Sequence, residues 1–304
     1  MFRDSCCGRT RKRRPTRAVP LAALGSAGLS LRDLYVLPTR KGTARGLLPA
    51  AGKGWYTWID DRSDYLAGKS VIVTGASSGI GASTARLLHA SRAYPVLAAR
   101  RADRLAVLSE ECGGALAVPT DVTDPAQVAD LVAAVLERHK RIDGLVNNAG
   151  ASLNGPLDEV DLGEFSRILQ LNVVGVLATT QAVLPTMRKQ QFGRIVNISS
   201  GTTRRVALGF GAYASAKTAV NMLSAVLRQE LADDGIAVSL LLPSMTATEF
   251  GDGMFTLGAS PRPGMVVHSP DYVAGVVLRL LRTGEESFDI PHGPQQPDLA
   301  RAPT

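Results

Sequence analysis

Short apolar runs alternate with longer amphipathic stretches between residues 69 and 290. The apolar runs predict buried strands at residues 70–73, 94–99, 115–119, 142–146, 194–198, 237–242 and 287–290. The amphipathic stretches predict helices over residues 80–93, 124–138, 212–231 and 270–282, and one long or two successive helices over 161–190. Strands that are apolar throughout and alternate with helices indicate a parallel sheet covered on both faces. We therefore expect an α/β fold with a single doubly wound sheet.

The first part of the chain lacks such a pattern. Residues 1–54 are rich in Arg, Gly, Pro and Ala without a sustained period of two or 3.6, so we expect disorder. Trp55 and Trp58 are expected to anchor this segment on the domain, with a partner contact as the alternative. The predicted division is a basic extension at 1–64, a catalytic domain at 65–292 and a tail at 293–304.

Charge is concentrated in the same extension. Residues 1–64 hold 13 Lys/Arg and 5 Asp/Glu, a net +8, whereas the rest holds 21 and 22, a net −1. The overall charge of +7 is therefore no argument that the main domain binds nucleic acid, and none is expected. The extension could be a disordered leader or an over-extended gene start. Its apolar run at 18–31 resembles a signal peptide but has no convincing cleavage site.

Cysteine usage and hydropathy bear on disulfides, metal sites and cellular location. Cys6, Cys7 and Cys112 form neither a C-x-x-C pair nor a Cys/His cluster, so no disulfide framework or metal site is expected. No stretch reaches the roughly 18 apolar residues that a membrane span needs. A reduced, cytoplasmic location without a membrane span is the prediction.

A glycine-rich turn follows the first predicted strand and opens the first helix, reading T-G-A-S-S-G-I-G over residues 74–81. Glycines allow a tight turn and close approach to a pyrophosphate, and the helix start offers N–H groups to it. The alternative is a plain strand–helix turn. The candidate nucleotide-binding residues here are Gly75, Ser77, Ser78, Gly79, Ile80 and Gly81.

A second constellation lies near the start of the helix predicted at 212–231. Tyr213 and Lys217 are four residues apart and share a helix face. A nearby ammonium favours the phenolate and is expected to lower the tyrosine pKa from about 10, which would make the phenol a proton donor or acceptor. Taken alone, this spacing is also typical of a surface pair. Ser199 and Ser200 end the fifth strand, and Ser200 lies thirteen residues before Tyr213.

The order of these motifs resembles the short-chain dehydrogenase/reductase family. The resemblance covers residues 69–292 and includes the glycine turn, N-N-A-G at 147–150, Asn172 in L-N-V-V-G, Ser200, and Y-x-x-x-K at 213–217. It implies a Rossmann-type doubly wound sheet and an oxidoreductase that interconverts a ketone or aldehyde and an alcohol. In this interpretation Ser200 orients the substrate oxygen, Tyr213 exchanges the proton, Lys217 tunes it and contacts the ribose, and Asn172 holds a relay water.

The resemblance also implies a nicotinamide cofactor and its contacts. No acidic residue ends the second strand, where Arg100 could pair with a 2′-phosphate, so NADP is expected over NAD, although NAD is possible. The implied contacts are Asp121 and Val122 at the adenine, Asn148, Ala149 and Gly150 along the cofactor, and Pro243, Thr246 and Thr248 after the sixth strand. Asp121 could instead be a turn residue and Thr248 a helix cap. Ser244 stands where the family commonly has Gly.

The substrate side is less specific. Residues 249–269 resemble a short apolar lid, which suits a small-molecule carbonyl or alcohol, although core packing is the alternative. Arg204 and Arg205 could meet an acidic substrate, lie in solvent or pair at an oligomer surface. A homo-oligomer, dimer or tetramer, is expected by analogy. The competing functions are a catalytically silent NAD(P)-binding protein and an interaction or membrane-surface protein driven by the basic extension.

Overall fold

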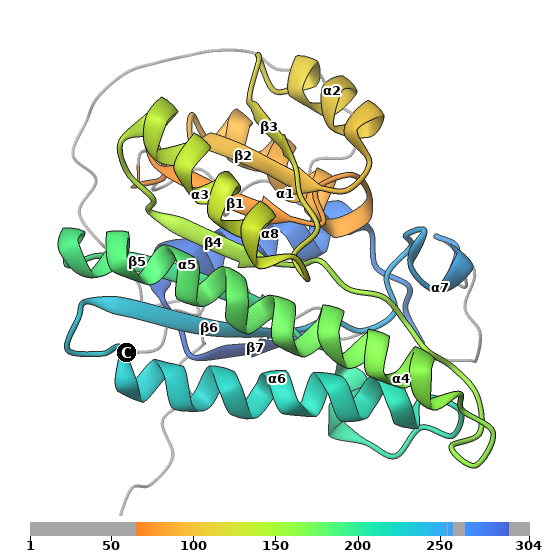
Figure 1. Cartoon of the computed structure of the whole chain (residues 1–304). Coiled ribbons are helices and arrows are strands. Elements are labelled where there is room, and N and C mark those ends of the chain that lie inside the picture. The colour runs from red at the N-terminus through yellow and green to blue at the C-terminus, as the bar shows by residue number, and fades with distance from the viewer. Residues whose placement is uncertain (1–64, 254, 258–264, 292–304) are drawn as a thin grey trace, which may run out of the picture. The chain divides into compact units, whose positions relative to one another are not determined.

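A computed structural model describes residues 65–253, 255–257 and 265–291 of the 304-residue chain. It contains one parallel sheet of seven strands in the order β3-β2-β1-β4-β5-β6-β7 (Figure 1). The strands are β1 (Ser70–Thr74), β2 (Tyr94–Ala99), β3 (Leu116–Pro119), β4 (Gly144–Asn147), β5 (Gly193–Ile198), β6 (Ile236–Leu242) and β7 (Ser287–Asp289). The predicted α/β, doubly wound fold is thereby confirmed.

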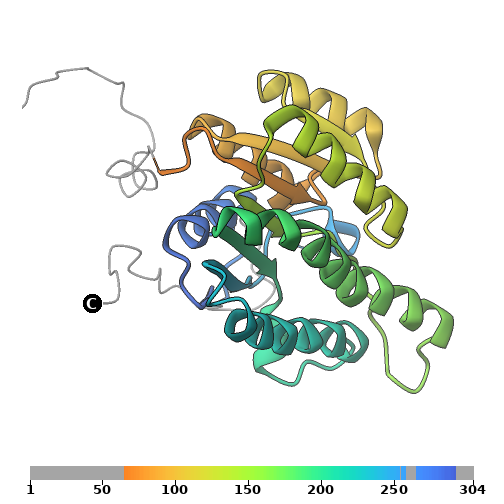
Figure 2. The ribbon, with the colours of Figure 1, turned by 60° about the vertical axis from the view of Figure 1, so that its left-hand side comes forward.

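Helices connect these strands and cover both faces of the sheet. They are α1 (Gly79–Ala90), α2 (Ala102–Glu111), α3 (Pro125–His139), α4 (Leu162–Leu169), α5 (Gly175–Gln190), α6 (Gly211–Glu230), α7 (Phe250–Gly253) and α8 (Pro270–Thr283), with a π-helix at Gln170–Val174 and a 3₁₀ turn at Gly201–Arg204. Figures 1 and 2 show α3, α5 and α6 on one face and α1 and α8 on the other. Asp124 caps α3 as expected, since its side chain accepts from two backbone N–H groups.

Two hydrophobic cores lie on opposite faces of the sheet. Along β1, Val71 and Val73 join the core that α1, α2 and α8 cover, whereas Ile72 joins the core beneath α3, α5 and α6. Each fully buried Val or Ile contributes about 1.5–3 kcal/mol relative to exposure. This alternation explains why the strand is apolar at every position, and it fixes the register of β1 against β2 and β4.

Besides the short α7 and the 3₁₀ turn, two longer elements differ from the prediction. Helix α2 was missed: its N-cap is Arg101, which makes no side-chain capping bond, and only Leu105 and Leu108 are buried along it. The stretch predicted as one or two helices is a continuous run in which a π-helix joins α4 to α5. This run, Leu162–Gln190, is the one described helix long and apolar enough to cross a membrane, and 44% of its most apolar window is buried within the domain.

Several predictions fall outside the described residues. These are the disorder of residues 1–64, the anchoring role of Trp55 and Trp58, the tail at 293–304 and part of the lid, at 254 and 258–264. They stay predictions.

Candidate active site

The predicted site residues gather at the carboxyl edge of the sheet. Neighbouring strands β1, β4 and β5 end at Thr74, Asn147 and Ile198, so the glycine turn, the N-N-A-G loop and Ser200 follow adjacent strands. In open parallel sheets, ligands bind in the crevice outside these strand ends. The topology therefore brings together motifs that are spread between positions 74 and 200 of the chain.

The glycine turn is shaped so that side chains cannot fit at its key positions. Gly75 has φ +64°, a backbone conformation that L side chains rarely adopt. A Cβ at Gly81 would lie 2.3 Å from the carbonyl oxygen of Gly75, and one at Gly79 would lie 2.9 Å from a methyl group of Thr248. The turn thus keeps the start of α1 close to β1 and open to a ligand, as a pyrophosphate site requires.

Thr74 holds the N-N-A-G loop against this turn. Its hydroxyl donates to the carbonyl oxygen of Val146 (3.2 Å) and accepts from the backbone N–H groups of Asn148 (3.0 Å) and Ala149 (3.1 Å). The Asn148 amide also donates to the carbonyl oxygens of Thr74 (3.0 Å) and Gly75 (3.2 Å). Thr74 is buried, and the sequence had not singled it out as a site residue.

The first asparagine of the motif has a different role. The buried Asn147 side chain donates to Asn197 Oδ1 (2.9 Å) and Thr180 Oγ1 (3.1 Å), and it accepts from the Thr179 hydroxyl (2.7 Å). This network joins β4, β5 and α5 in the interior, where each polar atom needs a partner. Asn147 therefore stabilises the sheet, while Asn148 shapes the site.

Asn172 lies in the π-helix, fully buried, and faces the same loop. Its side-chain amide donates to the carbonyl oxygen of Ala151 (2.9 Å), and its Oδ1 accepts from the Ala151 N–H (3.3 Å). A Cβ at Gly150 would lie 2.5 Å from Asn172 Oδ1 and 3.5 Å from Lys217 Nζ. Gly150 thus leaves the space in which Asn172 and Lys217 approach one another, at a π-bulge of the kind that is frequent in functional sites.

Tyr213 and Lys217 lie buried on α6, with 8% and 4% of their surfaces exposed. Lys217 Nζ donates to the carbonyl oxygen of Ile198 (2.9 Å) and lies 5.9 Å from the centroid of the Tyr213 ring. Burial lowers the pKa of Lys217 to about 8. Burial also raises the pKa of Tyr213 to about 12, and a hydrogen bond with Ser200 opposes that rise. The expected lowering of the tyrosine pKa by the ammonium is therefore not found: desolvation of the phenolate raises this pKa, and the hydrogen bond with Ser200 offsets only part of the rise.

The two serines after β5 have separate surroundings. The Ser199 hydroxyl is buried and donates to Asn221 Oδ1. Ser200 is half-buried, caps the following 3₁₀ turn by accepting from the Thr202 N–H (3.2 Å), and hydrogen-bonds Tyr213. The structure places Ser200 against the tyrosine and Ser199 in the interior; the role of Ser200 toward a substrate stays a prediction.

The two arginines at the end of β2 have different surroundings, and the pairing of Arg100 with a 2′-phosphate stays a prediction. Arg100 is exposed, and its charge is the smallest of four contributions to the pKa of Asp121, which is lowered chiefly by the Thr123 N–H. The next residue, Arg101, contacts the glycine turn instead: its guanidinium donates to the hydroxyls of Ser77 (2.9 Å) and Ser78 (2.8 Å). The signal for Arg101 was present in the sequence as the second of two arginines.

Asp121 and Val122 follow β3 and serve local structure. Asp121 Oδ1 accepts from the backbone N–H (2.9 Å) and the hydroxyl (2.7 Å) of Thr123, so the side chain stabilises a turn. Val122 is buried, and a Cβ at Gly175 would lie 2.9 Å from its methyl group. These contacts fit the turn interpretation of Asp121 and do not test an adenine contact.

The loop after β6 contains Pro243, Thr246 and Thr248. Thr246 forms a bridge with His268 that ties the loop to the segment before α8, and the Ser244 hydroxyl donates to the carbonyl oxygen of Pro291 (3.3 Å). Ser244 is thus accommodated where the family commonly has Gly. Pro243 is buried at the end of β6 and accepts from the Gly201 N–H (2.8 Å).

Thr248 and Phe250 lead from this loop toward the tyrosine. The Thr248 hydroxyl accepts from the Phe250 N–H (3.3 Å), which is the capping role considered from the sequence. The Phe250 ring lies 5.5 Å from the Tyr213 ring at 54°, so the short helix α7 begins directly beside Tyr213. In the described part of the predicted lid, Phe250 thus contacts the candidate site.

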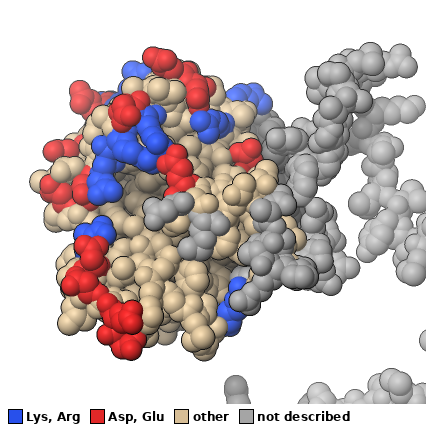
Figure 3. Space-filling view, turned by 90° about the vertical axis from the view of Figure 1, so that its right-hand side faces the viewer, with Lys and Arg blue, Asp and Glu red and all other residues tan. Residues whose placement is uncertain are grey.

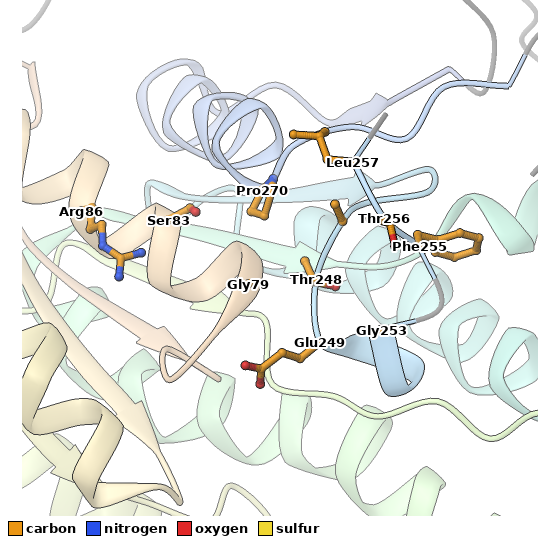
Figure 4. A pocket seen from close by; sticks show the side chains of 11 residues that line it. Gly79, Ser83, Arg86, Thr248, Glu249, Gly253, Phe255, Thr256, Leu257 and Pro270 are labelled. Atoms are coloured by element: carbon orange, nitrogen blue, oxygen red, sulfur yellow. The ribbon is translucent and has the colours of Figure 1, made fainter. Parts of the chain in front are cut away.

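An open pocket of about 470 Å³ lies between α1, this loop and the start of α8 (Figure 4). Gly79, Ser83, Thr248 and Pro270 are among its lining residues. The pocket is on the glycine-turn side of Thr248 and does not include Tyr213. No group of three or more His, Cys, Asp or Glu side chains that could hold a metal occurs among the described residues.

Comparisons with known proteins agree with this geometry. The family model described as short chain dehydrogenase matches residues 69–256, more than half of the chain. An uncharacterized oxidoreductase of Staphylococcus saprophyticus is 39% identical over 188 residues, which cover 60% of this chain and 76% of that protein. An uncharacterized oxidoreductase of Staphylococcus aureus strain N315 is 35% identical over 185 residues, covering 60% and 80%.

A solved structure is similar over the whole domain. The crystal structure of 3-ketoacyl-(acyl-carrier-protein) reductase from Brucella melitensis, complexed with NADH, superposes with a TM-score of 0.69 and 26% identity. The match covers 74% of this chain and 97% of that chain. With the family model, the sheet order and the motifs in agreement, this chain belongs to the short-chain dehydrogenase/reductase family of oxidoreductases.

Proposed function

We propose that the protein is an NAD(P)-dependent oxidoreductase that interconverts a ketone or aldehyde and the corresponding alcohol, with NADP preferred. The observation that carries the proposal is the buried Tyr213, in contact with Ser200 and one helical turn from Lys217, at the strand edge where the glycine turn lies. The similar reductase was solved with NADH, which supports a nicotinamide cofactor for this chain as well.

The residues around the crevice fit such a cofactor. The glycine turn has no side chains at positions where a Cβ would clash with the backbone or with Thr248, and this tight turn is the shape that a pyrophosphate site needs. Gly75, Ser77, Ser78, Gly79, Ile80 and Gly81 would hold the pyrophosphate, and Asp121 and Val122 the adenine, with Asn148, Ala149, Gly150, Pro243, Thr246 and Thr248 along the remainder. Lys217 would contact the nicotinamide ribose. When bound, the nicotinamide supplies or accepts the hydride.

Proton transfer is assigned to Tyr213. With a pKa of about 12 its phenol is protonated at neutral pH and is able to donate to a carbonyl oxygen. The Ser200 hydroxyl hydrogen-bonds the same substrate oxygen and polarises it. Lys217, which is buried beside the ring, stabilises the phenolate that donation leaves behind, and Asn172 organises the relay through which the proton returns.

The preference for NADP rests on the basic end of β2. No acidic side chain stands there to hold the ribose hydroxyls and repel a 2′-phosphate. Arg100 is exposed at this point, and Arg101 lies against the serines of the glycine turn. A guanidinium offers paired N–H donors to phosphate oxygens, so either arginine suits a 2′-phosphate.

The same proposal includes a homo-oligomer, a dimer or tetramer, in the cytoplasm. Met222 and Val226 lie one turn apart on α6 and are 66% and 44% exposed, and Val174 on the neighbouring π-helix is 46% exposed. Exposed apolar side chains one turn apart on a helix, such as Met222 and Val226, favour a protein contact. Light scattering of the purified full chain measures the oligomeric state directly.

A panel of ketones, aldehydes and alcohols, assayed with NADPH, NADH and their oxidised forms, tests the proposed reaction. We expect turnover of at least one moderately apolar carbonyl compound or alcohol, and better kcat/KM with NADP than with NAD. Equal or better turnover with NAD contradicts the cofactor preference. Cofactor binding without turnover of any compound in the panel favours a catalytically silent NAD(P)-binding protein instead.

A further inference from the structure

An acidic side chain reaches the arginines at the end of β2 from a distant part of the chain. Glu249 follows Thr248 in the loop after β6, and its carboxylate accepts from Arg101 (3.1 Å) and from Arg104 (2.7 Å). Figure 4 shows this side chain extending from the loop toward the beginning of α1, where Gly79 lies. Figure 3 shows basic side chains gathered on this face with acidic ones directly beside them.

Arg101 is the centre of this arrangement. One side of its guanidinium donates to the hydroxyls of Ser77 and Ser78 in the glycine turn, and Nη1 donates to Glu249. All three side chains of the acidic–basic cluster are partly exposed, Arg101 by 43%, Arg104 by 42% and Glu249 by 56%. A ligand anion could therefore displace the Glu249 carboxylate, which occupies the guanidinium N–H donors that such an anion would need.

We propose that Glu249 is a residue that determines cofactor selectivity, because its carboxylate competes with a 2′-phosphate for the guanidinium of Arg101. The inference rests on the proposed function, in which a nicotinamide dinucleotide lies along the glycine turn. A phosphate monoester and a carboxylate both accept paired N–H bonds from arginine, and two anions at one guanidinium repel each other. Glu249 thus restrains binding of the phosphorylated cofactor and leaves the unphosphorylated one unaffected.

The charge of Glu249 persists at neutral pH. Hydrogen bonds from Arg104, and next from Arg101, lower the pKa of its carboxyl group. The Glu249 carboxylate is therefore negatively charged at the neutral pH at which cofactor binding is measured. Because the pair is exposed, its contribution is modest: exposed ion pairs correspond to a change in affinity of about threefold.

Binding measurements on the full chain separate this role from catalysis. Dissociation constants of NADPH and NADH are measured by fluorescence titration for the unmodified protein, Glu249→Gln and Asp234→Asn. Asp234 is the matched control: it forms a similar exposed ion pair with Arg188 (2.7 Å), but it precedes β6 at the opposite edge of the sheet. Adenosine 2′,5′-bisphosphate and adenosine 5′-monophosphate serve as probes that lack the nicotinamide.

For Glu249→Gln we expect NADPH and the bisphosphate to bind about threefold more tightly, and NADH and the monophosphate to bind as before. The gain should shrink as salt is raised, since screening weakens exposed charges. Asp234→Asn should leave the dissociation constants of both cofactors unchanged. Thermal unfolding checks that each variant is folded.

The outcomes distinguish this inference from the proposed cofactor preference. If the unmodified chain prefers NADPH and Glu249→Gln binds it no more tightly, the inference is overturned and the preference stands. If the unmodified chain does not prefer NADPH but Glu249→Gln gains affinity for it alone, the inference is supported and the preference is wrong. Weaker NADPH binding in Glu249→Gln would mean that Glu249 positions Arg101, which also overturns the inference.

Discussion

The buried lysine of the candidate active site is expected to destabilise the fold at neutral pH. Lys217 is 4% exposed, and its ammonium donates to the carbonyl oxygen of Ile198. Burial lowers its pKa from 10.5 to about 8, because the charged form loses hydration that one hydrogen bond does not replace. Replacing the side chain by methionine, as Lys217→Met, keeps an unbranched chain of similar length and removes the charge.

The size of the effect follows from the pKa shift. At about 1.4 kcal/mol per pKa unit, the shift corresponds to roughly 3 kcal/mol of destabilisation below pH 8, where both the folded and unfolded states are protonated. Between pH 8 and 10.5 the unfolded chain binds the additional proton, so this contribution to stability rises with pH. Lys217→Met lacks this rise, and it also loses a hydrogen bond from a charged donor, worth about 1.5–3 kcal/mol.

We therefore expect the free energy of unfolding of Lys217→Met, relative to the unmodified protein, to fall by about 2–3 kcal/mol between pH 7 and pH 10. Urea titrations at pH 7, 8, 9 and 10 measure this difference, in which the other titrating groups cancel. The exposed Lys189→Met variant is the control and should show no such trend. A difference for Lys217→Met that does not change with pH would refute the reasoning, whatever its size.

Four further substitutions test the site. Tyr213→Phe should abolish turnover while cofactor affinity stays within a factor of about two; a near-native rate removes the assigned role. Gly81→Ala should destabilise the domain by about 1–3 kcal/mol and weaken binding of both cofactors, since its Cβ would lie 2.3 Å from the Gly75 carbonyl oxygen; unchanged urea midpoint and affinity would contradict the close approach. Arg101→Leu should weaken NADPH binding about tenfold and spare NADH; a larger loss in Arg100→Leu would return the phosphate contact to Arg100.

The contacts of the two arginines at the end of β2 could not be predicted from the sequence. The sequence showed two arginines in a row, and the pattern by itself favoured the first, Arg100. Successive side chains after a strand point in different directions, and in the folded chain it is Arg101 that donates to the serines of the glycine turn. The N-cap of α2, Arg101, makes no side-chain capping bond, so the sequence carried no capping signal for this helix.

Much of the site was nonetheless readable in the chain. Periodicity determined the strands and most helices, because burial on both faces of a sheet requires apolar residues at every strand position. The order of the glycine turn, N-N-A-G, Asn172, Ser200 and the Tyr213–Lys217 pair carried the resemblance to the family, and that resemblance implied the candidate residues.

Only the tertiary structure decided the protonation of the site and the partners of its charges. Burial is a property of the assembled core, so a sequence that places Lys217 one turn from Tyr213 suggests a lowered tyrosine pKa, whereas their shared desolvation moves it upward. The same holds for Glu249, which meets Arg101 across 148 residues of chain. Local spacing fixes which groups lie on one helix face; the low dielectric around them and their distant counter-charges exist only after the chain has folded.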